Sequence, residues 1–315
     1  MAEEDIPIED LKGVGDKTAT SLREAGYFDV LSVARTSSGT LADVTGMTDN
    51  KADTIITNAR EHIKSDSFAT GKEVQEQQSE LKRISTGSNA FNDLMYGGVP
   101  TNYITETYGA FGSGKTQISH QLAVNVQRPI DEGGLGRECI FIDTEDTFTA
   151  DRVVDMAKAH GMDPDEALEN IYVAKAFDSG HQINVTKDAY KMCAENDVGL
   201  VIVDSIIAHF RADYGGRGEL ADRQDKLNSH LKDLKRIAST FDIAVYITNQ
   251  IMHDPGEMFG NPIKPVGGNI LAHASAFRIW LRSKKNSNVA RLVDSPNLPP
   301  GEAEFVIETD GIRDV

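Results

Sequence analysis

From residue 83 onward, short runs of consecutive apolar residues alternate with stretches in which apolar residues recur every three or four positions. The short runs have the length of β-strands, and the second spacing places an apolar stripe along one side of a helix. Strands without a polar face are typical of a parallel sheet covered by helices on both sides, so the pattern predicts an α/β fold with a mainly parallel, twisted sheet. The predicted strands span 103–108, 138–143, 171–174, 199–204, 243–248, 276–282, 290–294 and 304–308, and the predicted helices span 115–126, 150–160, 183–196 and 220–241.

Residues 109–116 connect the first predicted strand to the first predicted helix. Their sequence, Gly-Ala-Phe-Gly-Ser-Gly-Lys-Thr, satisfies the G-x-x-x-x-G-K-[ST] spacing of a phosphate-binding P-loop. Glycines let backbone N–H groups close around phosphate oxygens, and the helix N-terminus adds positive potential. We therefore predict a nucleotide site in which Lys115 reaches the β- and γ-phosphates and the Thr116 hydroxyl holds Mg²⁺. An ordinary glycine-rich turn is the alternative, and the flanking strand and helix make it the weaker interpretation.

Three polar residues follow predicted strands at the edge of the sheet where ligands of parallel α/β folds bind. Asp204 ends the most apolar strand, where an Asp completes the Mg²⁺ shell directly or through water. Glu145 follows strand 138–143 and is placed to activate a water against the γ-phosphate. Gln250 follows strand 243–248, and its neutral amide could sense the γ-phosphate and pass its presence into the next loop. Together with the P-loop, these residues predict an ATPase.

The composition narrows the class of protein. Hydrophobic residues make up 39% of the 315 residues, enough for a sizeable core, and the length favours two domains. The net charge of −17 argues against coating nucleic acid through bulk charge, so any DNA contact must come from clustered basic residues. No apolar stretch is long enough to span a membrane, and the N-terminus lacks the apolar region of a signal peptide. Only Cys139 and Cys193 occur, so we expect no disulfide framework and a cytoplasmic protein.

Residues 1–63 form a separate small helical module. Two short apolar turns with glycine, 8–15 and 41–47, each lead into a predicted helix. This arrangement resembles the helix-hairpin-helix fold, and the resemblance implies that Gly13 and Gly15 expose backbone N–H groups to a phosphate of duplex DNA. A helical protein-interaction domain is the alternative, because acidic residues outnumber basic residues in this segment.

Residues 64–82 form a polar linker in which Phe68 is the conspicuous apolar residue. Such an aromatic side chain either packs back on its own domain or anchors the chain in a pocket of a neighbour. The ATPase core is then predicted to span 83–315.

Two glycine-rich loops follow the strand ends and are candidates for DNA binding. The first, 210–218, and the helix after it carry three arginines whose planar donors suit phosphates: Arg211, Arg217 and Arg223. The second, 254–268, contains three prolines and four glycines and has no secondary-structure pattern. The segment 278–291 carries five basic residues and no acid. Each cluster alone could be a solvated surface, but two such loops on one side of an ATPase sheet favour a nucleic-acid channel.

Taken together, these features resemble the archaeal RadA recombinases, which belong to the RecA/RadA family of DNA strand-exchange ATPases. The resemblance covers nearly all of the chain. Segment 294–299, Asp-Ser-Pro-Asn-Leu-Pro, resembles the segment that caps ATP bound on the neighbouring subunit. The chain differs from the usual pattern at Ala110, where the family usually has Glu, and at Thr149 and Ala150, where it usually has Arg-Pro. The most specific matching pieces are 109–117, 141–145, 200–205, 210–224, 247–250 and 266–273.

The resemblance implies an ATP-dependent DNA recombinase that forms a filament on single-stranded DNA, with ATP and Mg²⁺ at each subunit interface. Its partners would be single-stranded DNA, double-stranded DNA and further copies of the chain. Glu145 would be the general base, acting with Lys115 and Gln250, and Phe68 would serve polymerisation. The ATP-binding residues implied in this way are Gly109, Ala110, Phe111, Gly112, Ser113, Gly114, Lys115, Thr116, Gln117, Arg152 on the adenine, Asp294 and Pro299.

Two other functions stay open from the sequence. A recombination mediator of the same fold would bind DNA and the main recombinase without exchanging strands. The N-terminal module, Phe68 and both loops argue against it. A RecA-fold helicase that forms rings, or a regulatory switch of that fold, is the second alternative. The paired arginines of the first loop and the cap segment 294–299 argue against that one.

Overall fold

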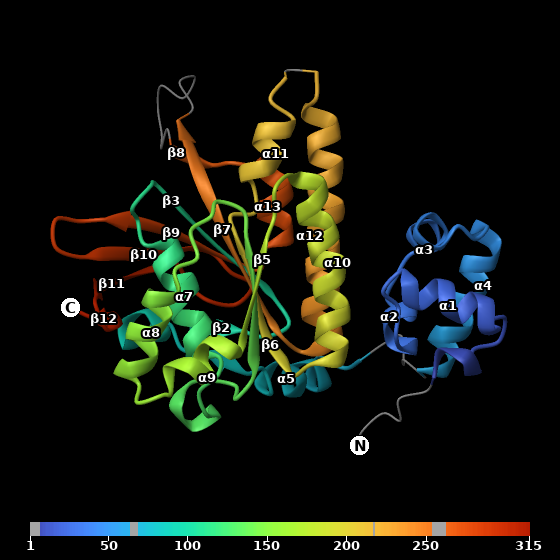
Figure 1. Ribbon diagram of the computed structural model, residues 1–315, viewed down its shortest axis with the longest axis horizontal. Coiled ribbons are helices and arrows are strands. Elements are labelled where there is room, and N and C mark those ends of the chain that lie inside the picture. The colour runs from blue at the N-terminus through green and yellow to red at the C-terminus, as the bar shows by residue number, and fades with distance from the viewer. Residues whose placement is uncertain (1–6, 64–68, 217, 254–262) are drawn as a thin grey trace. The chain divides into compact units, whose positions relative to one another are not determined.

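The computed structural model describes residues 7–63, 69–216, 218–253 and 263–315. The chain folds as two units, Met1–Leu81 and Lys82–Val315 (Figure 1). Phe68, Arg217 and residues 254–262 of the second loop lie outside the described residues. Among the described helices, none combines the length and the apolar character needed to cross a bilayer.

The N-terminal unit is helical and has a core of its own. Its elements are η1 (Ile8–Asp10), α1 (Asp16–Glu24), α2 (Val30–Ala34), α3 (Ser38–Thr45), α4 (Asp49–His62) and α5 (Gly71–Ser79). Three helices begin at short polar side chains, because Asp29, Ser37 and Thr48 accept backbone N–H groups in the first turns of α2, α3 and α4. The core side chains without exposed surface include Ile8, Leu22, Val33, Leu41 and Ile55.

Helix α5 lies within the predicted linker, and the hydropathy pattern did not predict it. None of its residues is buried, so no apolar stripe marks it in the sequence. A capping box marks its start instead: Thr70 and Glu73 exchange hydrogen bonds between side chain and backbone.

The core unit is built on a ten-stranded sheet in the order β12-β11-β10-β9-β3-β7-β6-β4-β5, with β8 paired to β7. Neighbours from β5 to β9 along this order run parallel, whereas β9 to β12 form antiparallel pairs. The strands are β3 (Ile104–Gly109), β4 (Glu138–Asp143), β5 (Ile171–Lys175), β6 (Val198–Asp204), β7 (Ala244–His253), β8 (Ile263–Pro265), β9 (Phe277–Ser283), β10 (Asn288–Asp294), β11 (Gly301–Glu308) and β12 (Gly311–Asp314). A small second sheet pairs β1 (Arg83–Ile84) with β2 (Val99–Pro100).

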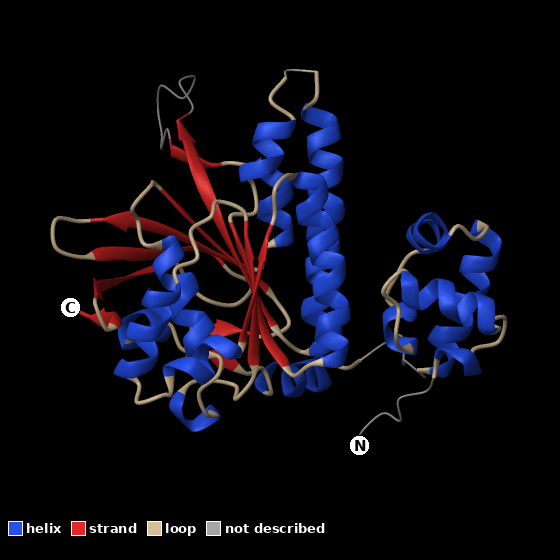
Figure 2. Ribbon diagram, in the orientation of Figure 1, coloured by secondary structure: helices blue, strands red, loops and turns tan. Residues whose placement is uncertain are grey.

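Helices cover both faces of this sheet, which confirms the predicted α/β class. Helix α7 (Lys115–Asn125) packs on β3, β4, β6 and β7 with α8 (Ala150–Ala159) beside it, and α10 (Ser179–Glu195) and α12 (Leu220–Phe241) lie on the opposite face (Figures 1 and 2). Strand β6 is buried at every position as a result. The shorter helices are α6 (Asn89–Leu94), η2 (Ile130–Glu132), α9 (Pro164–Glu169), α11 (Ala208–Asp213) and α13 (Gly268–Ala274).

Strand β3, which leads into the P-loop, carries a buried charged residue, Glu106, that the apolar pattern did not predict. The Glu106 side chain has no exposed surface and accepts hydrogen bonds from Arg278 Nε at 2.6 Å and Asn249 Nδ2 at 2.7 Å. Asn249 Nδ2 also lies 2.8 Å from the carbonyl oxygen of Val266. Because removing one partner of a buried ion pair leaves an uncompensated charge, these contacts hold β3, β7 and β9 together and fix the end of the second loop.

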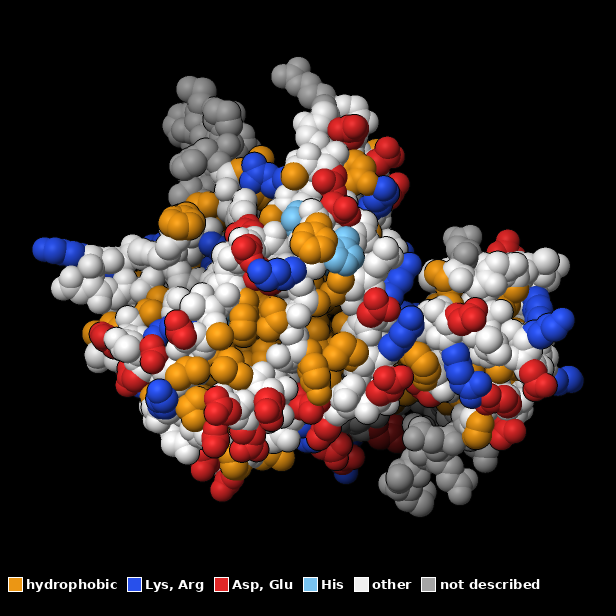
Figure 3. Space-filling model, viewed as in Figure 1, with side chains coloured by type: hydrophobic (Ala, Val, Ile, Leu, Met, Phe, Trp, Pro, Cys, Tyr) orange, Lys and Arg blue, Asp and Glu red, His pale blue; other side chains and the backbone are white. Residues whose placement is uncertain are grey.

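The negative net charge lies on the surface. Figure 3 shows acidic side chains gathered over α8 and α9 at the lower edge of the core in that view. Exposed acids of this region include Asp163, Asp165, Glu166 and Glu169. These acids lie on α9 or just before it. The P-loop lies at the carboxyl ends of the strands, away from this cluster.

Candidate functional site

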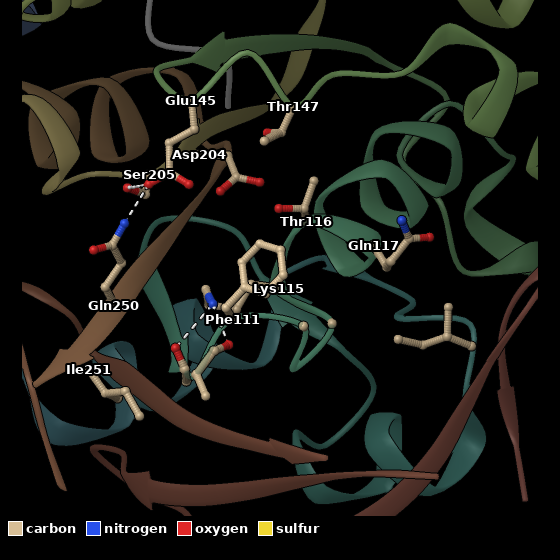
Figure 4. Close-up of a pocket in the computed structure, with 15 residues that line it drawn as sticks. Phe111, Lys115, Thr116, Gln117, Glu145, Thr147, Asp204, Ser205, Gln250 and Ile251 are labelled. Atoms are coloured by element: carbon tan, nitrogen blue, oxygen red, sulfur yellow. Dashed lines mark hydrogen bonds between the residues drawn. The ribbon is translucent and has the colours of Figure 1, made fainter. Parts of the chain in front are cut away.

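The P-loop lies at the carboxyl end of β3, between β7 and β9. The sheet register pairs Gly109 with Gln250 on β7 and with Leu281 on β9, and α7 begins at Lys115. Gly114 has φ +97°, and a Cβ there would come 2.8 Å from Ile307 Cδ1, so only glycine fits this position. The loop encloses a pocket of about 530 Å³ together with Glu145, Asp204, Ser205 and Gln250 from the neighbouring strand ends (Figure 4).

Lys115 is the cation of this pocket. Its Nζ donates to the carbonyl oxygens of Gly109 at 3.1 Å and Ala110 at 3.0 Å. Burial lowers the pKa of Lys115, and the negative charges of Asp204 and Glu145 partly oppose that shift. The ammonium group is thus held by neutral carbonyl oxygens that phosphate oxygens can replace, which suits a residue that meets the β- and γ-phosphates.

Asp204 is a buried carboxylate at the end of β6. Thr248 Oγ1 donates a short hydrogen bond to its Oδ1, and Ser119 Oγ lies 3.3 Å from its Oδ2. Burial raises the pKa of Asp204, while hydrogen bonds from Thr248 and Thr116 lower it. A desolvated carboxylate beside the Thr116 hydroxyl offers the oxygen ligands that a hard divalent cation prefers, so these two residues fit Mg²⁺.

Glu145 follows β4 and faces the pocket. Its Oε1 accepts hydrogen bonds from Ser205 Oγ at 2.9 Å and Gln250 Nε2 at 2.6 Å (Figure 4). Both partners donate to the same carboxylate oxygen. Glu145 is exposed, so a water can reach its side chain. This arrangement suits a general base.

The turn that carries Glu145 is held by Asp143, a strand-end residue for which the sequence predicted no role. Asp143 is 1% exposed, and its Oδ1 accepts the backbone N–H groups of Glu145 and Thr147, each at 3.1 Å. Its Oδ2 accepts the N–H of Phe148 at 2.9 Å. Three backbone donors on one buried carboxylate fix the path of this turn. The available signal was an Asp at a strand end, which favours hydrogen bonds to backbone groups a few residues on.

His120 joins the P-loop helix to the start of α8. Its Nδ1 lies 2.7 Å from the Thr116 carbonyl oxygen, and its Nε2 lies 3.0 Å from the Thr149 backbone nitrogen. The first contact requires a proton on Nδ1 and the second an unprotonated Nε2, so the ring is neutral. Burial lowers the pKa of His120, partly opposed by the bond to Thr116, and this favours the same state.

Gln250 links the pocket to the first loop. While its Nε2 donates to Glu145, its Oε1 accepts a hydrogen bond from Arg211 Nη1 at 3.1 Å. Arg211 lies on α11 at the start of the first loop, and its side chain is exposed. A continuous chain of hydrogen bonds therefore connects a candidate DNA-binding arginine to the candidate general base.

Arg152 lies on α8 outside the lining of this pocket. Its Nε donates to Gln117 Oε1 at 2.6 Å, Nη2 donates to the Glu308 carbonyl oxygen at 2.6 Å, and Nη1 donates to the Thr309 carbonyl oxygen. These bonds use the edge of the guanidinium group and fix its plane. An adenine ring would stack on the flat face of this group, which takes no part in these hydrogen bonds.

The predicted cap residues Asp294 and Pro299 do not line this pocket. Asp294 ends β10, and Pro299 precedes β11. Arg223 lies in the first turn of α12, whereas Arg217 and Phe68 lie outside the described residues. In the N-terminal unit Gly13 has φ +94°, and Gly15 is the N-cap of α1 with open space at its Cα. Gly15 has extended backbone, so its advantage is small size rather than unusual φ.

Segment 278–291 is less positive in the structure than in the sequence. Arg278 pairs with the buried Glu106, Arg282 Nη2 lies 2.6 Å from Glu302, and Lys284 Nζ lies 2.7 Å from Glu304. Both exposed acids lie on β11, which the register places beside β10. The acids that the segment lacks are therefore supplied by the neighbouring strand.

Comparison with protein families assigns both units. A family model described as Rad51 matches residues 77–315, and a model described as a SAM-like helix-hairpin-helix tandem matches residues 6–61. The first match contains the P-loop and the strand ends around it, and the second contains both glycine turns of the N-terminal unit.

Proposed function

The chain belongs to the Rad51 family, and on that premise we propose that it is an ATP-dependent DNA recombinase that forms a filament on single-stranded DNA and catalyses homologous pairing and strand exchange. Members of this family are DNA-dependent ATPases, and the N-terminal unit is a helix-hairpin-helix DNA-binding domain. The observation that supports this function most directly is the chain Arg211–Gln250–Glu145, because it connects a DNA-facing loop to the hydrolytic residue.

ATP hydrolysis would use the pocket at the end of β3. Backbone N–H groups of the loop and Lys115 bind the phosphates, and Glu145 takes the proton of the water that attacks the γ-phosphorus atom. Mg²⁺, held by Thr116 and Asp204, would neutralise charge that develops on the phosphate oxygens. Asp143 and Ser205 keep Glu145 in place through the bonds described above.

DNA would be held by local basic groups inside an acidic envelope. Arg211, Arg217 and Arg223 lie in the first loop or within the first turn of the helix that follows it, so in a filament they would recur once per subunit. Gly13 and Gly15 would present backbone N–H groups to a phosphate of duplex DNA. Arg282 of β9 and Arg291 of β10 contribute less, because Glu302 of β11 supplies their counter-charge.

Assembly would complete the ATP site. The cap segment 294–299, with Asp294 and Pro299, would close over ATP bound on the neighbouring subunit. The position of both residues outside the pocket of their own chain supports this assignment. Phe68 would anchor each subunit in a pocket of the next.

Negative-stain electron microscopy with ATP and single-stranded DNA, combined with a strand-exchange assay, tests the proposal. We expect helical filaments and exchange of homologous strands. Binding of DNA without a regular assembly would instead identify a mediator, and closed rings would identify a helicase-like ATPase. A Lys115→Ala variant is the matched control, because it should lose both filaments and exchange while keeping its fold.

A further inference from the structure

The hairpin formed by β9 and β10 holds the P-loop through residues that do not line the pocket. Ser283, the last residue of β9, donates from Oγ to the Gly112 carbonyl oxygen at 3.1 Å. Asn288, the first residue of β10, donates from Nδ2 to the Ser113 carbonyl oxygen at 3.2 Å. The same Nδ2 lies 3.4 Å from Ser283 Oγ, so both of its hydrogens have acceptors.

These bonds determine where the backbone N–H groups of the loop point. In a trans peptide the C=O and the following N–H point in opposite directions within one plane. Asn288 holds the Ser113 carbonyl oxygen toward the hairpin, so the N–H of Gly114 is directed to the other side. Gly114 lines the pocket, and the backbone N–H groups of a P-loop are the donors that cradle nucleotide phosphates.

The Asn288 side chain, which donates to the P-loop, is enclosed by its neighbours. It is 9% exposed, and the register places it between Ser283 on β9 and Phe305 on β11. In this enclosed position the Asn288 amide donates to the loop.

We propose that Asn288 is a positioning residue for nucleotide binding, which aims the Gly114 N–H at the phosphates by holding the Ser113 carbonyl. This inference rests on the proposed binding of ATP, and it adds a residue that lies in sequence far beyond the P-loop motif. Asn288 does not line the pocket. Its loss therefore weakens phosphate binding without altering the hydrolytic step at Glu145.

Isothermal titration with ATP and with ADP compares the wild type with Asn288→Ala and Asn288→Asp. Loss of one hydrogen bond that orients a phosphate donor should weaken both nucleotides about five- to tenfold in Asn288→Ala. Asn288→Asp keeps the shape but offers only acceptors to the Ser113 carbonyl, so it should weaken both further. The rate of hydrolysis at saturating ATP should stay within about twofold of the wild type in Asn288→Ala, since Glu145 is unaffected.

Ser287→Ala is the control, because Ser287 lies in the same hairpin but donates to Glu304 instead of the P-loop. It should bind both nucleotides like the wild type. Wild-type affinity in Asn288→Asp with weaker binding in Asn288→Ala would overturn the inference, since shape alone would then matter. Unchanged affinities in both Asn288 variants would overturn it as well. If the wild type itself bound neither nucleotide, the proposed function would fail together with this inference.

Discussion

At the scale of single residues, the position of the Glu145 side chain is set by hydrogen bonds to one of its carboxylate oxygens. Ser205 and Gln250 both donate to Oε1, while Asp143 fixes the backbone that carries the side chain. The second carboxylate oxygen carries neither of these bonds. A base held in this way can accept a proton from a water without rearranging its own turn.

Glu145→Gln should therefore keep ATP binding and lose hydrolysis. General-base assistance contributes about 10²–10⁴-fold, so phosphate release should fall by that factor while titration calorimetry gives an unchanged affinity. Asp146→Asn is the matched control, because Asp146 lies in the same turn but pairs with Lys175 on the surface. Hydrolysis at the wild-type rate in Glu145→Gln would remove Glu145 from the role.

His230 on α12 should make the stability of the core depend on pH. The side chain has no exposed surface, its ring stacks on Phe210, and burial lowers its pKa to about 3. In the unfolded chain its pKa is about 6.5, so between these values only the unfolded state binds the proton. The free energy of unfolding should then fall as pH drops below about 6.5, by about 2 kcal/mol at pH 5 from this residue.

Urea unfolding followed by Trp280 fluorescence measures this dependence, since Trp280 is the single tryptophan and lies in β9 of the core. The variant His230→Gln cannot titrate and should show a flatter dependence between pH 5 and pH 7, whatever its absolute stability. His273→Gln replaces an exposed histidine of the same unit and should leave the slope unchanged. Equal slopes in wild type and His230→Gln would contradict the assignment.

At the scale of elements, α11 and the end of β7 couple the first loop to the pocket. Arg211 Nη1 holds the oxygen of the Gln250 amide, and this orients the amide nitrogen toward Glu145. A DNA phosphate that drew Arg211 away would release the amide and so remove one of the two hydrogen bonds on Glu145 Oε1. The connection gives a direct physical route from DNA binding to hydrolysis.

Arg211→Ala and Arg223→Ala should have similar effects on DNA binding and different effects on ATP hydrolysis without DNA. Both should weaken binding of single-stranded DNA and lower the salt slope by about 0.7 log units per lost phosphate contact. Arg211→Ala alone should also raise hydrolysis without DNA, by about two- to fivefold for one released hydrogen bond. Fluorescence anisotropy at several salt concentrations and phosphate release without DNA measure the two effects. If both variants hydrolyse ATP without DNA at the wild-type rate, the route through Gln250 is wrong.

At the scale of the whole molecule, charge and assembly act together. The chain carries a net charge of −17, and its exposed acids gather over α8 and α9 (Figure 3). Arg282, Lys284 and Arg291 of the β9–β10 hairpin lie close to the acids Glu302 and Glu304 of β11. Affinity for DNA is then expected from loops that a filament repeats along its axis rather than from the surface of one subunit.

Phe68→Glu should leave a folded monomer that binds ATP poorly. A charge placed in a dry apolar pocket costs several kcal/mol, and in the proposed filament the ATP site would need the neighbour's segment 294–299. Val74→Glu is the control, since Val74 is an exposed apolar residue of the same linker region on α5. Light scattering that gives the same oligomers for Phe68→Glu and the wild type would place the anchor elsewhere.

The sequence by itself determined eight strands of the large sheet, all but β8 and β12, together with the main helices and the P-loop. These features depend on residues that lie close together in the sequence. Runs of apolar residues predict strands, apolar residues three or four positions apart predict helices, and the spacing of the glycines predicts the phosphate loop. The three polar strand ends followed from one rule, that the carboxyl ends of parallel strands meet at one edge. The same local logic missed α5, because a helix with no buried face leaves no apolar period.

Only the tertiary structure decided which side chains meet across the sheet. Glu106 and Arg278 lie 172 positions apart, Ser113 and Asn288 175 positions apart, and Glu145 and Gln250 105 positions apart. No local pattern links such pairs, because strand order and register bring them together, and a change of one residue in register would turn each side chain to the other face. The pairing of Arg282 and Lys284 with acids on β11 has the same origin. Local spacing therefore supplies the chemical groups of this protein, and the register of its sheet decides which of them act on one another.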